Sequence, residues 1–189
     1  MGTTLPTITA AAFGYAKLPY SLSFSFSQDV SGTLSIASLQ VRNLTAEVDE
    51  RPAEVAYDHA INRATFHFTG QVLCGRYRAT LPAARIADAF GRRLGRDFEF
   101  DFFFLAGDVN HDGKVDFLDL EIIAANYHRS GTSFAQGDLN YDGRVDFADL
   151  MIVRRNYLRA LPGAAAPVTG TPPRFLSPKL KQHRRHRRF

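Results

Sequence analysis

Tryptophan is absent from the 189-residue chain, and cysteine occurs once, at Cys74. A single cysteine cannot form an intramolecular disulfide, and no pattern of histidine and asparagine accompanies it as in cysteine hydrolases. We therefore interpret Cys74 as a small buried residue rather than a nucleophile. The lack of tryptophan removes the residue that most often stacks on sugars, which leaves Tyr15, Tyr20 and Tyr77 as alternative stacking platforms.

Long apolar runs and a secretion signal are missing as well. No stretch of about 18 apolar residues occurs, so we expect no membrane span, and the first residues lack the charged and apolar regions of a signal peptide. The net charge is +4, but no recognition helix or RNA-binding sheet motif accompanies it, so we expect no specific nucleic-acid binding. No carboxylate pair or nucleophile stands out, so we predict that the chain is not an enzyme.

The most informative feature of the chain is one unit that occurs twice. Segments 107–127 and 137–157 read GDVNHDGKVDFLDLEIIAANY and GDLNYDGRVDFADLMIVRRNY, with 13 of 21 positions identical. Oxygen-bearing side chains occupy positions 1, 3, 5, 9 and 12 of a loop, glycine occupies position 6, and position 7 offers its carbonyl, which is the EF-hand spacing. The predicted ligands are Asp108, Asn110, Asp112, Lys114, Asp116 and Asp119, then Asp138, Asn140, Asp142, Arg144, Asp146 and Asp149.

Oxygen ligands without cysteine or histidine at a ligand position favour calcium over zinc, so we expect two calcium ions. His111 lies at position 4, which points away from the ion, and we interpret it as a solvated loop residue. Position 12 is Asp119 or Asp149 instead of the usual glutamate, so the following helix must begin closer to the ion. Because carboxylates in one loop repel each other without a cation, we expect folding of this part to require metal.

The first loop follows residues 98–102, whose alternation of apolar and polar residues predicts a strand, whereas an ordinary EF-hand begins with a helix. Two loop–helix units without entering helices resemble the type I dockerin domain of cellulosome-type proteins, over residues 106–161. The resemblance implies calcium binding, a cohesin-type partner, an extracellular or cell-surface location and a link to polysaccharide degradation. A calmodulin-like sensor is disfavoured, because the entering helices and the methionine-rich groove are missing.

Residues 7–105 show short runs of period two, such as Ser21–Phe26 and Tyr77–Leu81, bounded by turn signals. About seven such strands predict an antiparallel β-sandwich. Its sequence pattern is similar to that of the Ig-like modules that precede dockerins in large secreted proteins, notably of planctomycete type. The fold class expected for the chain is therefore an all-β Ig-like sandwich followed by a small all-α dockerin. Residues 162–189 read as a disordered linker and basic tail.

In the dockerin family, loop positions 10 and 11 and helix positions 17 and 18 contact the cohesin. The second copy places Phe147, Ala148, Arg154 and Arg155 there, and only this copy has a basic pair; the first has apolar residues. The resemblance therefore implies a monomeric, noncatalytic docking module whose second copy binds a cohesin on a scaffold or surface protein. The alternative is a purely structural calcium-stabilised C-terminal module without a cohesin partner.

Overall fold

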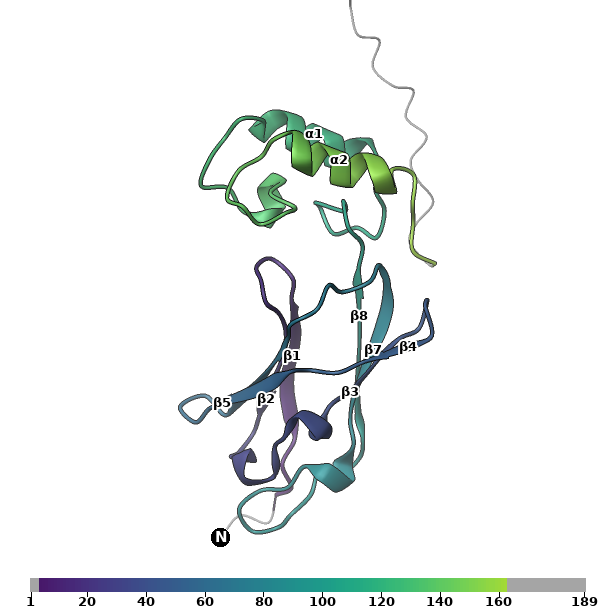
Figure 1. The fold of residues 1–189 in the computed structure, drawn as a ribbon. Coiled ribbons are helices and arrows are strands. Elements are labelled where there is room, and N and C mark those ends of the chain that lie inside the picture. Colours follow the sequence, from purple (N-terminus) through teal and green to yellow (C-terminus); the bar gives the residue numbers. More distant parts are fainter. Residues whose placement is uncertain (1–3, 163–189) are drawn as a thin grey trace, which may run out of the picture.

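The computed structural model describes residues 4–162, in which eight strands are followed by two helices (Figure 1). One sheet has the order β1-β2-β6-β5 and the other β4-β3-β7-β8, and all pairings are antiparallel. This confirms the predicted sandwich and the small helical module after it. The strands are β1 (Ile8–Gly14), β2 (Tyr20–Phe26), β3 (Gln40–Asn43), β4 (Val48–Glu50), β5 (Glu54–Asp58), β6 (Arg63–Phe68), β7 (Gly75–Leu81) and β8 (Phe98–Phe104).

The period-two runs form the sandwich core, as alternation requires of strands that bury one face. In β2, Leu22 and Phe24 are fully buried while the serines between them are only half-buried. In β6 and β7, Phe66 and Ala79 lie opposite them in the same cluster. Burying each large apolar side chain contributes about 1.5–3 kcal/mol, so this core stabilises the sandwich substantially.

Two of the three proposed sugar platforms are buried, which excludes these two. Tyr20 is 7% exposed and Tyr77 is 1% exposed, and both belong to the sandwich core. The third, Tyr15, lies in the β1–β2 connection and is half-buried, with its ring stacked on His111. One face of the Tyr15 ring is therefore covered by the first predicted calcium loop.

The helices α1 (Phe117–Asn126) and α2 (Phe147–Asn156) lie side by side at one end of the molecule (Figure 1). Ile123 and Val153 are their buried contact residues, in a second core that also contains Leu105 and Val109. Tyr127 and Tyr157 are 36% and 40% exposed. They follow the last helical residue, where the chain turns away from the core. The proposed linker and tail lie outside the described residues, apart from the turn at Pro162.

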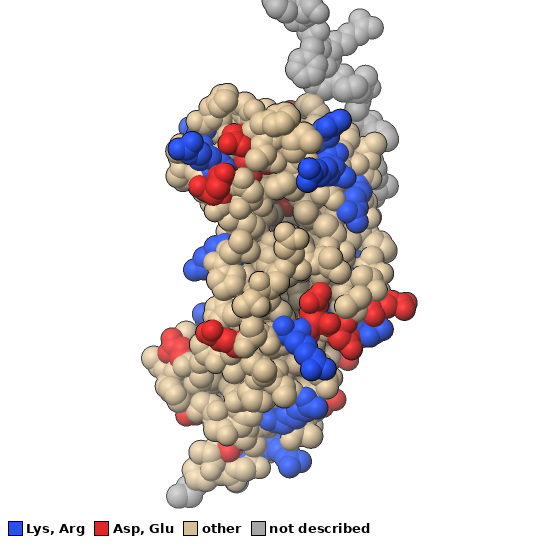
Figure 2. Space-filling model, in the orientation of Figure 1, with Lys and Arg blue, Asp and Glu red and all other residues tan. Residues whose placement is uncertain are grey.

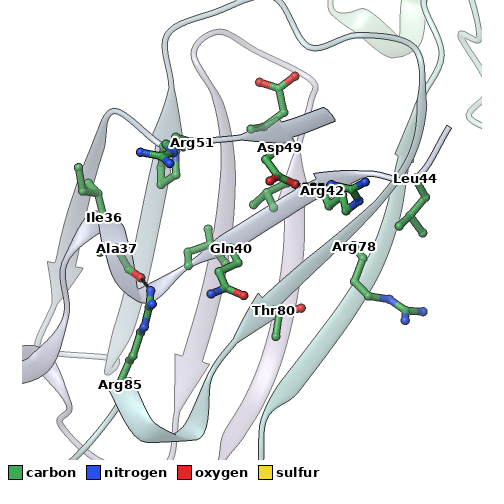
Figure 3. A pocket seen from close by; sticks show the side chains of 14 residues that line it. Ile36, Ala37, Gln40, Arg42, Leu44, Asp49, Arg51, Arg78, Thr80 and Arg85 are labelled. Carbon is green, nitrogen blue, oxygen red and sulfur yellow. Dashed lines mark hydrogen bonds and ion pairs between the residues drawn. The ribbon is translucent and has the colours of Figure 1, made fainter. Parts of the chain in front are cut away.

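A groove of about 630 Å³ crosses the outer face of the second sheet (Figure 3). Two of its four arginines are paired with acids across the strands: Arg42 with Asp49 at 2.9 Å, and Arg78 with Asp101 at 2.7 Å and with Glu99 at 3.2 Å. The other two are Arg51 and Arg85, and Arg85 donates to the Ala37 carbonyl. The paired charges compensate one another across the strands. No helix of the described part has the length and apolar character needed to cross a membrane.

Candidate metal centre

The first loop curls around the carboxylate of Asp108, which is fully buried. One oxygen accepts the Asp112 backbone N–H at 3.0 Å and the other accepts that of Gly113 at 2.8 Å. Gly113 has a φ of 85°, a conformation that glycine adopts without strain. The chain thus reverses around position 1, as the predicted loop requires.

The last residue of this loop, Asp119, connects the two ends of the loop. One carboxylate oxygen accepts the Val109 N–H at 2.7 Å and the other accepts the Asp116 N–H at 2.8 Å. Asp116 in turn accepts the Leu118 N–H at 2.9 Å, so the two aspartates form a capping box at the start of α1. Because α1 begins only two residues before Asp119, the aspartate side chain reaches the loop although it is shorter than the usual glutamate.

The second loop repeats this network. Asp138 accepts the N–H groups of Asp142 and Gly143 at 3.1 and 3.0 Å. Asp149 accepts those of Leu139 and Asp146 at 2.8 and 2.9 Å. The internal duplication read from the sequence is therefore a duplication of hydrogen bonds.

Each loop also pairs with the segment that follows the other helix. The Val115 N–H donates to the Arg159 carbonyl at 2.9 Å, and the Val145 N–H donates to the Arg129 carbonyl at 3.1 Å. Isolated antiparallel bridges join Lys114 to Ala160 and Arg144 to Ser130. The two units are therefore interlocked about a pseudo-twofold axis, and neither loop is held by its own helix alone.

Residues 106–159 match the family model described as "Dockerin type I domain". The chain carries a type I dockerin domain there. Dockerins are noncatalytic, calcium-binding modules whose family partner is a cohesin, and they are typically extracellular or on the cell surface. The two interlocked loop–helix units described above form this domain.

No curated protein matches the chain. Among solved structures, the chain is similar to the bacterial S-layer protein rSbsC(31-844), at 15% identity and a TM-score of 0.43, over 53% of this chain and 14% of that one. It is also similar to native alpha-2-macroglobulin from E. coli, at 10% identity and a TM-score of 0.42, over 53% of this chain and 6% of that one. The chain thus spans a small part of either protein, and likeness at this level carries no functional argument.

Electrostatics in the dockerin loops favour a cation. The pKa of Asp108 is raised to about 7, first by burial and also by the nearby Asp119 and Asp112 carboxylates, against the lowering effect of the Gly113 and Asp112 amides. Burial likewise raises the pKa of Asp119 and of Asp138. Buried carboxylates that lie close together stay ionised only with a compensating positive charge, which a divalent ion would supply.

The donor chemistry of the dockerin loops fits calcium. Among the described residues, no three His, Cys, Asp or Glu side chains gather closely enough to form a metal site by themselves. An EF-hand loop uses a mixed set, in which asparagine and a main-chain carbonyl join the carboxylates. Asn110 and Asn140 supply this amide oxygen at position 3, and they also bond to the aspartates at position 5 of their loops.

One sequence expectation about the dockerin is wrong. His111 is half-buried, and its ring stacks on Tyr15 and on Phe103, each with 4.1 Å between ring centroids. Position 4 does point away from the loop centre, as expected, but the sandwich lies there instead of solvent. Sequence periodicity carries no signal for this contact, because Tyr15 is nearly a hundred residues away.

The proposed partner residues of the dockerin all lie on its surface. Phe147 is 62% exposed, and Ala148, Arg154 and Arg155 are also exposed. An apolar groove of about 340 Å³ lies beside them, lined by Leu120, Ile123, Ala124, Tyr127 and Leu150.

Proposed function

We propose that this chain is a calcium-dependent docking module in which the dockerin attaches a secreted protein to a cohesin-bearing scaffold or surface partner, in the setting of extracellular polysaccharide degradation. The observation that supports this most is the exposed helix face. It lies at the end of the molecule, on the far side of the dockerin from the sandwich (Figure 1), where a large partner can approach. We further propose that each loop binds one calcium ion through its six predicted ligand residues. We also propose that the chain is a monomer.

The second copy is the proposed contact region. Its exposed surface combines a large apolar side chain, Phe147, with two cations, Arg154 and Arg155. Figure 2 shows basic side chains gathered over the α2 end of the dockerin. Aromatic and arginine residues are the types that dominate binding energy at protein interfaces. The matching surface of the first copy has Ala124 and Ala125, which offer little contact area and no charge.

A binding measurement with purified cohesin domains tests this proposal. The full chain should capture a cohesin in calcium and release it in EDTA. Arg154→Ala combined with Arg155→Ala should weaken binding by roughly tenfold and reduce its salt dependence, because rim cations act mainly on association. The matched control, Ala124→Ser with Ala125→Ser, should bind as wild type. Equal losses in the two variants would contradict the assignment to the second copy.

The structural alternative has one observation in its favour. The dockerin is packed on the sandwich through buried Phe104 and Leu105 at the junction, and not tethered by a loose linker. A calcium-stabilised end to a longer protein would use the same contacts. If no cohesin binds while calcium still orders the helices, the structural function is the one to retain.

A further inference from the structure

The fourth residue of each calcium loop faces the same part of the sandwich. His111 and Tyr141 occupy these positions and have φ angles of 59° and 62°. This left-handed conformation is costly for residues other than glycine, so it persists only where the surrounding structure holds it. It turns the two side chains out of the loops, away from the proposed ligands on either side of each.

His111 lies between two rings of the sandwich. Its imidazole is nearly parallel to both, at 15° to Tyr15 and 15° to Phe103. Tyr15 belongs to the connection between β1 and β2, and Phe103 lies in β8 of the other sheet. The first loop therefore contacts both layers of the sandwich at once.

Tyr141 makes the equivalent contact from the second loop. Its hydroxyl donates to the Tyr15 carbonyl at 2.9 Å and is 3.2 Å from the Tyr20 hydroxyl. Its ring packs edge-on against Tyr20 and stacks on Phe134, which itself meets Tyr15 edge-on. Tyr15 thus contacts both loops, through its ring on His111 and through its carbonyl on the Tyr141 hydroxyl.

A third contact joins the two parts beside these rings. The Ala106 N–H, two residues before the first ligand, donates to the Cys74 sulfur at 3.3 Å. Cys74 also packs against the core of the dockerin. The β1–β2 connection, β8 and the residue before β7 therefore surround the loop side of the dockerin and leave its helix side open, as Figure 1 shows.

We propose that the β1–β2 connection is a built-in docking surface for both calcium loops, so that calcium binding and the orientation of the sandwich are coupled. Residue 4 lies between the ligands at positions 3 and 5, and a loop closed around an ion fixes its direction. An open loop does not. The inference rests on the calcium binding proposed above, and it adds that the sandwich sets the calcium affinity and that calcium sets the angle between the sandwich and the docking face.

Coupling between two sites is reciprocal, which gives a sharp test. In the full chain, Tyr15→Ala changes no proposed ligand, yet it removes the ring that stacks on His111 of the first loop and keeps the carbonyl that Tyr141 of the second loop contacts. Isothermal titration should show a calcium dissociation constant raised about fivefold or more, the lower range of measured couplings. The matched control is Tyr57→Ala, a half-buried tyrosine whose hydroxyl contacts Val30 and Asn62 within the sandwich.

Orientation is measured separately, by small-angle scattering with calcium and with EDTA. His111→Ala and the milder Tyr141→Phe should each broaden the distribution of inter-domain distances in calcium. His128→Ala, an exposed histidine with a φ of 65°, should leave it narrow. Tyr141→Phe keeps the ring, so it tests the contact even if His111→Ala folds poorly.

The outcomes separate this inference from the function on which it rests. Wild-type affinity in Tyr15→Ala, or scattering in which His111→Ala and Tyr141→Phe match His128→Ala, would overturn the coupling. A wild-type chain that takes up no calcium would overturn both the coupling and the calcium-dependent function. Failure to bind any cohesin, with the coupling intact, would count against the docking function alone.

Discussion

The two copies of the loop–helix unit share their backbone contacts and differ in their outward side chains. In each loop, the carboxylate at position 1 accepts hydrogen bonds from the backbone amides of positions 5 and 6. The carboxylate at position 12 accepts those of positions 2 and 9 and so joins the two ends of its loop. Yet Lys114 is 7% exposed while its counterpart Arg144 is exposed. Phe117 is half-buried while Phe147 is 62% exposed.

This difference shows which positions the fold constrains. The aspartates and glycines that close each loop are the same in both units, and the buried helix residues that meet the other copy, Ile123 and Val153, are both β-branched and apolar. Residues outside that network are free to differ, and they set the chemistry of the docking face. A duplicated module can therefore keep one fold and offer two different surfaces.

Calcium removal should have the largest effect and should break the two copies together. Each loop pairs with the segment after the other helix, so when one unit opens the other loses its pairing partner. A stretch of about 50 residues also has too small a core to stay folded alone. EDTA should abolish the helical circular dichroism of 106–161 in one cooperative transition and spare the sandwich. Two separate steps, or a helical signal unchanged by chelation, would show that the copies are independent or that metal is not needed.

Glycine at the residue before each first ligand is predicted to matter next most. Gly137 has a φ of 102°, and an added Cβ would lie 2.9 Å from the Ile123 Cγ1 atom of the other unit. Gly131 has a φ of 70° but open space around it. We expect Gly131→Ala to cost about 1–2 kcal/mol of unfolding free energy from backbone strain alone. Gly137→Ala should cost about 1–3 kcal/mol more, because of overpacking.

Urea denaturation in saturating calcium measures both variants under the same conditions. The difference between them isolates the contact between copies from the cost of the positive φ. If the two variants were equally destabilised, the close approach of the first ligand segment to the opposite helix would have no energetic weight.

The two phenylalanines at loop position 10 should separate stability from docking. Phe117→Ala should lower the unfolding free energy by about 1–2 kcal/mol, since it removes partly buried apolar area. Phe147→Ala should change it by less than about 0.5 kcal/mol, as is usual for exposed sites. Thermal denaturation measures these two stability changes. In cohesin binding the order should be reversed, with the larger loss for Phe147→Ala. A larger stability loss at Phe147 than at Phe117 would mean that the exposed ring is not reserved for a partner.

The loops and helices were predictable from the sequence because their causes are local. Ligand spacing, the glycine at position 6 and the capping aspartates all act within a dozen residues, and the repeat doubles each signal. Strand alternation likewise located the sandwich core. The predicted ligand set stays a prediction, although the loop geometry fits it.

The contacts between distant segments were not predictable in the same way. The burial of His111 depends on how the sandwich meets the dockerin, which no periodicity encodes. One signal was present: Gly107 and Asn126 recur at Gly137 and Asn156 although none of them is a ligand. Identity at non-ligand positions of a repeat indicates contacts within or between the copies.

The last prediction tests where the copies should remain equal. The Asn126 side-chain amide donates to the Ile122 carbonyl at 2.9 Å, and that of Asn156 donates to the Ile152 carbonyl at 3.0 Å. Each asparagine thus adds a side-chain hydrogen bond to a carbonyl near the end of its helix, which is worth about 1 kcal/mol. Asn126→Ala and Asn156→Ala should therefore lower the unfolding free energy by the same amount in calcium, as measured by urea denaturation. Unequal losses would show that the asymmetry of the outer surface extends into the backbone network, and the two units could no longer be treated as one fold with two faces.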